Sequence, residues 1–342
     1  MYLQSIAHSV PSFSLSQAEC WQVLENSQCL DRLNTRSIQI LEKILLGDSG
    51  IEKRHFAAES AESIFGMDAE ALNQNFEARG PLLASDAIRK ALEKAELKPS
   101  QLDALVVSTC TGYLCPGLSS HISEQLGLNP DAFLQDVVGL GCGAAIPTLR
   151  NASHIISASP ESIVACVSVE LCSSAFYLDN DPGVLISACL FGDAASATIW
   201  GNRESGNSYR ISNFDTIHLP ENRELIRFVN SGGKLRNKLH RSLPEKAAES
   251  VAKLYSNADL VENTAIANHT GGRDVINALE KNLPTHSLQP SRDTLRRYGN
   301  TSSPSVMITL EQILEAGMPE KEIWLTSFGA GFAAHSCSLK KE

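Results

Sequence analysis

The sequence predicts an α/β fold of two similar halves with mainly parallel sheets. Three observations support this prediction: apolar strand-like runs alternate with helical patterns, the runs are continuously apolar, and the same order of elements occurs twice. Strands and helices that alternate at this spacing favour βαβ units with right-handed crossovers. Strands of a parallel sheet are covered on both faces, so they are expected to be apolar throughout.

The elements of the first half follow this order. A helical pattern over 81–97 leads to the apolar run 105–109. A second apolar run begins at Val137 and breaks at glycine before another helical pattern, and the run 163–169 closes the half. Each run has the length of a strand and is followed by turn residues.

The second half repeats the order. Residues 244–255 have a helical pattern, 264–268 form an apolar run, and 274–280 are predicted to form an amphipathic helix. The turn at 299–300 opens a further helical stretch, and the apolar run 323–327 ends the half. This recurrence predicts a duplicated unit.

Two segments do not belong to the repeat. Residues 14–61 have short helical patterns with a break at 47–50, and we expect them to cap the first half. Residues 202–242 are rich in Asn, Ser, Gly and charge, and we expect them to connect the halves and to contribute to the mouth of a site. The predicted units are therefore 1–201 and 202–342.

Composition excludes several classes of function. The 342 residues are 43% hydrophobic and 20% charged, as in ordinary globular proteins, and the net charge of −10 argues against a nucleic-acid partner. There is no membrane-length apolar run and no visible signal peptide, so a cytoplasmic location without a membrane span is expected. Basic residues that could meet an anionic ligand gather in two places, namely Lys53, Arg54 and His55, and Lys234, Arg236, Lys238, His240 and Arg241.

The nine cysteines indicate free thiols rather than a metal site. Cys110 and Cys115 are separated by four residues, and no matching pair of histidines completes a zinc pattern. We therefore expect no structural metal and a reducing environment.

Cys142 is the candidate nucleophile. It lies between Gly141 and Gly143, where an apolar run turns into a helical pattern. A thiol in the first turn of a helix experiences the positive end of the helix dipole, which favours the thiolate. The flanking glycines allow a tight turn and a close approach by substrate. A buried, inert cysteine is the alternative for this residue taken alone.

His269 and Asn300 are the candidate partners of this thiol. Each lies in a turn that precedes a helical pattern, His269 directly after an apolar run and Asn300 after a glycine. Functional side chains of open α/β folds gather at such junctions. Either residue alone also fits a structural role, but three residues at the same kind of junction favour a shared site.

Seven motifs carry the most specific signal. In chain order they are 49–54 (SGIEKR), 115–117 (CPG), 141–143 (GCG), 190–193 (LFGD), 269–273 (HTGGR), 298–303 (YGNTSS) and 328–331 (FGAG). In this order and over nearly the whole chain, they resemble the type III polyketide synthases, the chalcone and stilbene synthase family of the thiolase superfamily. The resemblance implies a five-layered α-β-α-β-α fold of two duplicated halves and a homodimer.

The resemblance also implies an activity. It makes Cys142 the residue that accepts an acyl starter, with His269 and Asn300 completing a catalytic triad. Repeated decarboxylative condensation with malonyl units and cyclisation would give a resorcinol, pyrone or phloroglucinol. The implied substrates are malonyl-CoA and an acyl-CoA or acyl carrier protein, without a metal or organic cofactor. The chemistry agrees, because His269 can hold Cys142 as a thiolate while imidazole and amide N–H groups donate to a thioester oxygen.

Further site residues follow from the resemblance. Phe191 matches the aromatic gate between the cavity and the pantetheine tunnel. Cys110, Cys172 and Ser302 match positions on the cavity wall, and Cys115 matches the position that the family inserts into the partner subunit.

The chain departs from the plant enzymes in features that bear on the donor. Those enzymes hold the CoA phosphates with several basic residues before the first motif, whereas only Lys43 is basic here, at a different position. The donor is then an acyl carrier protein, or CoA held through Lys53, Arg54 or Arg236. Ala330 replaces a proline of the plant loop. Small residues resemble the bacterial branch at three further positions, Cys110, Cys172 and Ala175.

Two alternatives to an iterative synthase remain. A 3-oxoacyl-ACP synthase III-like ketosynthase, of the type that initiates fatty acid synthesis, shares the triad and performs a single condensation. Residues 270–273 resemble the polyketide branch instead. A non-catalytic scaffold is the second alternative, and the intact triad argues against it.

Overall fold

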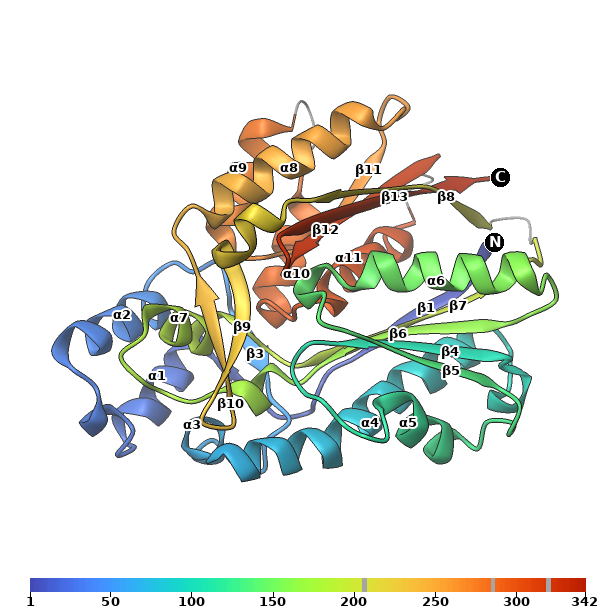
Figure 1. Ribbon diagram of the computed structural model, residues 1–342. Coiled ribbons are helices and arrows are strands. Elements are labelled where there is room, and N and C mark those ends of the chain that lie inside the picture. Colours follow the sequence, from blue (N-terminus) through green and yellow to red (C-terminus); the bar gives the residue numbers. More distant parts are fainter. Residues whose placement is uncertain (205–207, 284–286, 318–320) are drawn as a thin grey trace.

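The computed structural model describes residues 1–204, 208–283, 287–317 and 321–342 (Figure 1). Within these residues the main sheet has nine strands in the order β11-β12-β13-β8-β1-β7-β6-β4-β5. These strands are β1 (Tyr2–Ser9), β4 (Ala104–Thr109), β5 (Phe133–Val138), β6 (Val164–Glu170), β7 (Ala194–Gly201), β8 (Tyr209–His218), β11 (Ala265–Asn268), β12 (Glu322–Gly329) and β13 (Ala333–Lys341). Short strands form two further pairs, β2 (Ser14–Ser16) with β3 (Lys53–His55) and β9 (Ile226–Ser231) with β10 (Lys234–Leu239).

The elements stack in five layers (Figure 1). The described helices are α1 (Gln17–Glu25), α2 (Thr35–Leu45), α3 (Ser63–Gly66), α4 (Ala69–Lys94), α5 (Leu118–Leu126), α6 (Ala145–Ala158), α7 (Pro182–Leu190), α8 (Leu243–Asn257), α9 (Arg273–Asn282), α10 (Gln289–Tyr298) and α11 (Pro304–Glu315). Helices α4 and α5 cover one outer face, α8 and α9 cover the other, and α6 and α11 lie in the middle layer. The predicted fold class is confirmed. None of the described helices is both long and apolar enough to cross a membrane.

Strand direction is more mixed than the sequence predicts. The parallel pairs are β4 with β5, β4 with β6, and β11 with β12. The other five pairs of the main sheet are antiparallel. A helical crossover returns the chain to the same end of a sheet and gives a parallel strand, whereas the short turn at 330–332 joins β12 to an antiparallel β13.

Three hydrophobic cores correspond to the layers. The central core joins both parts of the sheet to α6 and α11, with Leu149 and Leu310 among its fully enclosed side chains. A second core packs α4 and α5 on the strands of the first half, and a third packs α8 and α9 on those of the second half. The two parts of the sheet meet through a short β1–β8 pairing at Tyr2 and Leu3.

The ends of the parallel strands place the polar residues of the site. Cys110 follows β4, Glu170 ends β6, and His269 follows β11. The turn after β5 carries Cys142. Because carboxyl ends of neighbouring parallel strands lie at the same edge, residues distant in sequence converge there.

Two segment predictions are corrected. Residues 202–242 were expected to be the least regular part of the chain, where it connects the halves, but they contain the central strand β8 and the β9–β10 hairpin. The helix expected at 81–97 begins earlier, at Ala69, because the Asp68 carboxylate caps it by accepting from Ala71 N at 2.9 Å. Pro81 then lies inside the helix, where it lacks a backbone donor.

The N-terminal segment packs as a cap, as expected. Helices α1 and α2 form a hydrophobic cluster with α7, and this cluster includes Cys142, Cys172 and Phe191. Ser16 and Glu19 form a capping box that begins α1. The cap therefore supplies one wall beside the candidate nucleophile.

Candidate active site

The nucleophile turn is held against the second half of the fold. Cys142 lies in the 3-10 turn Gly141–Gly143, between β5 and α6, with Gly141 at φ +59°. A Cβ atom on Gly329, at the end of β12, would come within 2.5 Å of Gly143 N. Only glycine permits this approach of the two backbones. The thiol of Cys142 is buried in the resulting turn.

A hydrogen-bond chain sets the tautomer of His269. Its Nδ1 atom lies 2.6 Å from the hydroxyl of Ser305, and that hydroxyl donates to Ser302 O at 2.8 Å. The Ser305 oxygen therefore accepts from Nδ1–H, which leaves the lone pair of the imidazole on Nε2. The edge of the Phe328 ring packs on the imidazole with centroids 5.0 Å apart.

Asn300 is fixed by its own turn. Its amide oxygen accepts from Ser302 N at 2.9 Å, and Nδ2 donates to Gly271 O at 2.7 Å. One amide N–H remains for a ligand. Gly299 has φ +71° and Ser302 has φ +58°, a left-handed conformation that costs about 1 kcal/mol or more for a non-glycine residue. The strained turn aims the Ser302 hydroxyl at Cys142 Sγ, 3.2 Å away.

The three candidate residues line one cavity. Cys142, His269 and Asn300 share its wall, and its volume is about 610 Å³, which is in the range of small-molecule sites. Lys43, Asp48, His240, Arg241 and Arg273 also line it. The sequence predicted that the three candidates lie at the same kind of turn before a helix, and the tertiary structure places them around one cavity.

Burial makes the free site electrically neutral. It raises the pKa of Cys142 to about 12, an effect that the Ser302 hydroxyl only partly offsets. Burial also lowers the pKa of His269 to about 3. Both shifts favour a thiol and a neutral imidazole at neutral pH, opposite to the thiolate that the helix dipole was expected to favour.

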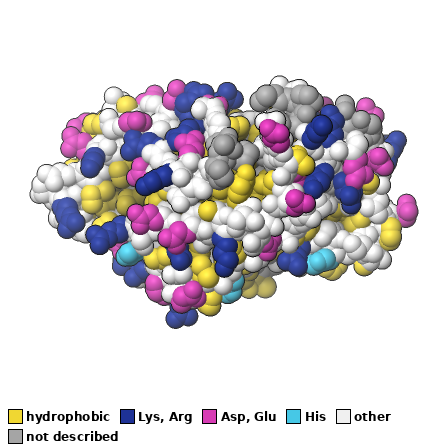
Figure 2. All heavy atoms as spheres, turned by 90° about the horizontal axis from the view of Figure 1, so that it is seen from above, with side chains coloured by type: hydrophobic (Ala, Val, Ile, Leu, Met, Phe, Trp, Pro, Cys, Tyr) yellow, Lys and Arg dark blue, Asp and Glu magenta, His cyan; other side chains and the backbone are white. Residues whose placement is uncertain are grey.

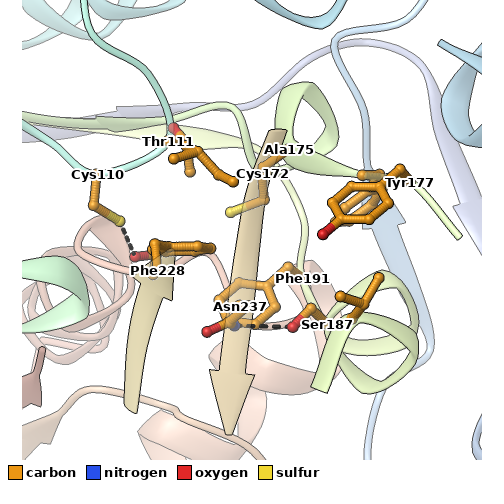
Figure 3. Close-up of a pocket in the computed structure, with 13 residues that line it drawn as sticks. Cys110, Thr111, Cys172, Ala175, Tyr177, Ser187, Phe191, Phe228 and Asn237 are labelled. Carbon is orange, nitrogen blue, oxygen red and sulfur yellow. Dashed lines mark hydrogen bonds between the residues drawn. The ribbon is translucent and has the colours of Figure 1, made fainter. Parts of the chain in front are cut away.

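A second, smaller cavity lies beyond Phe191. Its lining includes Cys110, Cys172, Phe191, Phe228 and Ser302, and its free volume is about 20 Å³, room for about one water molecule. Figure 3 shows the side chains pointing inward, with Asn237 Nδ2 donating to Ser187 Oγ at 2.9 Å. Phe191 also lines the larger cavity, so its ring lies between the two. The predicted gate residue and the three predicted wall residues thus line the same small cavity.

Glu170 is a site residue that the sequence analysis missed. Its carboxylate is fully buried and accepts hydrogen bonds from Ser303 Oγ at 2.6 Å, Thr111 Oγ1 at 2.9 Å and Cys110 N at 3.0 Å. Ser302 Oγ lies 3.3 Å from it. Burial raises the pKa of Glu170. The available signal was a charged residue that ends an otherwise apolar strand.

The predicted donor-binding residues do not line either cavity. Arg54 is completely buried, where it binds backbone carbonyls, so it is not available to a phosphate. Arg236 pairs with Asp179 at 2.8 Å, and Lys53 lies off the cavity walls. Cys115 is exposed and also lies off these walls.

The cavity mouth carries a few separate charged side chains. Arg273 pairs with Asp48 at 3.2 Å, whereas Lys43 and Arg241 have no carboxylate partner in the described part of the chain. Figure 2 shows basic and acidic side chains interspersed on the face above α8 and α9, without a continuous basic surface. Among the described residues, no group of three or more His, Cys, Asp or Glu side chains is arranged to hold a metal ion.

Two family models match the chain. The model described as FAE1/Type III polyketide synthase-like protein matches residues 8–218. The model of the 3-oxoacyl-[acyl-carrier-protein] synthase III C-terminal part matches residues 261–341. The candidate nucleophile falls in the first match, and the candidate His and Asn fall in the second.

Curated relatives cover most of the chain. A 1,3,6,8-tetrahydroxynaphthalene synthase of Streptomyces griseus is 27% identical, over 85% of this chain and 80% of its own length. A phloroglucinol synthase of Pseudomonas fluorescens is 25% identical, over 86% of this chain and 87% of its own length. Among solved structures, PKS-I of the brown alga Ectocarpus siliculosus is similar in fold, with a TM-score of 0.88 and 24% identity over 99% of this chain and 98% of that chain.

The buried thiol predicts the pH dependence of alkylation. Because only the thiolate reacts and the pKa of Cys142 is raised to about 12, iodoacetamide should label Cys142 faster by about tenfold per pH unit between pH 7 and 10. Peptide mass spectrometry would measure the labelling, with exposed Cys115 as an internal reference. A plateau below pH 8 would contradict this prediction and indicate a resting thiolate.

Proposed function

The chain belongs to the FAE1/type III polyketide synthase-like family, and from this premise we propose that it loads an acyl starter on Cys142, extends it with malonyl units and cyclises the product. The observation that carries the proposal is the shared cavity of Cys142, His269 and Asn300. The first of these residues comes from one half of the fold and the other two come from the other half. We propose 1–201 and 202–342 as these halves.

Loading begins with transfer of the Cys142 proton to His269. The thioester carbonyl of the starter enters beside the thiol, His269 Nε2 takes the proton, and sulfur attacks the carbonyl carbon. The proton turns Nε2 into a donor, so Nε2–H and the free N–H of Asn300 can both bind the oxyanion. The carrier thiol then leaves with the proton, and the starter remains on Cys142.

Extension uses the Asn300 N–H again, and Nε2–H joins it after His269 has taken up a proton from solvent; this proton passes to the Cys142 sulfur when that sulfur is released. A malonyl thioester loses carbon dioxide, and negative charge moves to its carbonyl oxygen as an enolate. Donors that face this oxygen lower the energy of the charged state in a site without bulk water. The enolate carbon attacks the acyl carbon on Cys142, and the sulfur is released for the next round. No metal or organic cofactor takes part in these steps.

Cyclisation is proposed to occur at the thioester on Cys142, near Glu170. Ser302 lies within 3.3 Å of both the Glu170 carboxylate and Cys142 Sγ, so it can relay a proton near the thioester. The named relatives, which are tetrahydroxynaphthalene and phloroglucinol synthases, favour a compact aromatic product. A resorcinol, pyrone or phloroglucinol has this character.

The donor is proposed to be a phosphopantetheine thioester held at the mouth. Lys43 and Arg241, from different elements, can bind its phosphate without first breaking an ion pair. CoA and an acyl carrier protein share this phosphate chemistry. A reducing, cytoplasmic setting suits the nine free thiols, which include the nucleophile.

A homodimer is proposed through the edge strand β5. Phe133 is 53% and Val138 is 52% exposed on this edge. Tyr113, 76% exposed, and exposed Cys115 lie in a nearby loop between β4 and α5. An apolar edge strand would be covered by pairing with a second copy.

A single-condensation ketosynthase remains the second candidate. The match of residues 261–341 to the C-terminal part of 3-oxoacyl-[acyl-carrier-protein] synthase III favours it. Product mass separates the two functions, because one condensation adds a single two-carbon unit.

Labelled malonyl-CoA should give multiply labelled cyclic products. Purified enzyme would be incubated with starters from aromatic to long-chain acyl-CoA, and with the same acyl groups on a carrier protein. We expect three or more labelled units per product by mass spectrometry, and none from Cys142→Ala. One labelled unit would support the ketosynthase, and product formation by Cys142→Ala would contradict the proposal.

Phe228→Gly should lengthen the product. Phe228 and Leu235 line both the small cavity and a neighbouring cavity of about 660 Å³, so removal of the ring should join the two. The expected result is a shift of the product mixture by one or more two-carbon units, measured by mass spectrometry. Phe214→Gly, which removes a ring elsewhere, is the control. An unchanged product length in Phe228→Gly would show that this wall does not limit extension.

Charge reversal at the mouth should weaken donor binding. Lys43→Glu and Arg241→Glu are each expected to raise KM for the thioester donor about tenfold, with kcat changed little, because they remove a charge-assisted phosphate contact. Steady-state kinetics at low salt would measure this. Lys281→Glu on α9 is the control, and an equal rise of KM in that variant would indicate a general charge effect.

A further inference from the structure

One buried cation has no role in the steps above. Arg54, in β3, is 0% exposed, yet it lies beside the site rather than in its wall. In the described residues it forms no ion pair with a carboxylate. A fully buried guanidinium is costly unless its hydrogen bonds are well placed, so its partners indicate what it does.

Arg54 binds the C-terminal end of α7. Its Nη1 atom donates to Ala188 O at 2.7 Å and to Phe191 O at 2.8 Å. Its Nε atom donates to Gln17 Oε1 at 2.9 Å, and Gln17 Nε2 donates to Cys189 O at 2.9 Å. Positive charge at the end of a helix also interacts favourably with the helix dipole. The pair therefore fixes the backbone that carries the Phe191 ring.

The same backbone is joined to Asn300. Asn300 N donates to Leu190 O at 2.9 Å, and Gly192 N donates to Asn300 O at 3.1 Å. The two hydrogen bonds form an isolated parallel bridge between Phe191 and Asn300. The gate ring and the oxyanion amide thus belong to one hydrogen-bonded unit.

The stem of Arg54 also packs on the turn of Asn300. A Cβ atom on Gly299 would lie 2.8 Å from Arg54 Cγ, so the turn is in close contact with this side chain. A Cβ atom on Gly192 would lie 3.4 Å from Arg54 Cβ. Gly192 and Gly299, which adjoin the bridge, therefore both pack closely against Arg54.

We propose that Arg54 is a positioning residue that fixes Phe191 and Asn300 relative to each other. The guanidinium binds the backbone at the end of α7, which carries Phe191, and the aliphatic part of Arg54 packs on the turn that carries Asn300. The bridge between Phe191 and Asn300 couples these two segments. Loss of Arg54 would displace the Asn300 N–H from the enolate oxygen without touching the Cys142 turn. The consequence for the reaction rests on the proposed function, whereas the structural coupling does not.

Decarboxylation tests the catalytic consequence. Arg54→Met should lower kcat for carbon dioxide release from malonyl-CoA by about 100-fold, as expected for a displacement of the Asn300 amide by about 1 Å. Arg54→Lys should lower kcat by about 10-fold, because lysine keeps the positive charge but lacks the planar set of guanidinium donors. KM and the alkylation rate of Cys142 should each change less than about threefold, because the mouth and the thiol turn are untouched. Arg292→Met, which removes an arginine paired with Glu280 at 2.5 Å, is the control for lost stability.

Hydrogen exchange tests the coupling without the reaction. In Arg54→Met, the amides of Gly192 and Asn300 should exchange at least about 10-fold faster than in wild type, while Arg292→Met leaves them unchanged. Unchanged exchange in Arg54→Met would overturn the proposal, as would a loss of decarboxylation that matches that of Arg292→Met. If wild type releases no carbon dioxide, the proposed function fails, and the exchange comparison still decides the role of Arg54.

Discussion

The site depends on the contact between the glycine turn of Cys142 and the end of β12. A Cβ atom on Gly329 would lie 2.5 Å from Gly143 N, so the backbone of Gly143 leaves no room for a side chain at position 329. Ser327 Oγ reinforces the contact by donating to Gly143 O at 3.1 Å. This contact brings the candidate nucleophile, Cys142, into one cavity with residues 269 and 300. The central α6 and α11 layer holds the two halves in this relation.

Burial has two opposite effects on this site. It removes water from the place where an oxyanion would form, which strengthens each hydrogen bond to that oxygen. It also raises the pKa of Cys142 and lowers that of His269, so the charged pair is not the resting state. In the proposed mechanism, proton transfer then accompanies substrate binding. The Ser305 hydroxyl prepares for it by holding the imidazole in the tautomer with a free Nε2 lone pair.

Local sequence patterns predicted the candidate site better than its surroundings. Gly141 before Cys142 and Gly299 before Asn300 both have a positive φ, and both glycines are visible in the sequence. By contrast, Lys43 was considered out of place, and Arg54 was assigned to donor binding. Lys43 lines the mouth and Arg54 is buried, because exposure depends on how α2, α7 and β3 pack and not on residue type. Glu170 was missed because its partners come from two segments far from it in the sequence, 110–111 and 303.

The sequence by itself determined the α/β class, the alternation of strands and helices and the three polar junctions. These depend on periodicity and turn chemistry, which act over a few residues. Only the tertiary structure decided the antiparallel pairs, the central position of β8, the neutral resting state of Cys142 and His269 and the volume on each side of Phe191. These depend on how whole elements pack against one another, through burial and side-chain volume that no local pattern records.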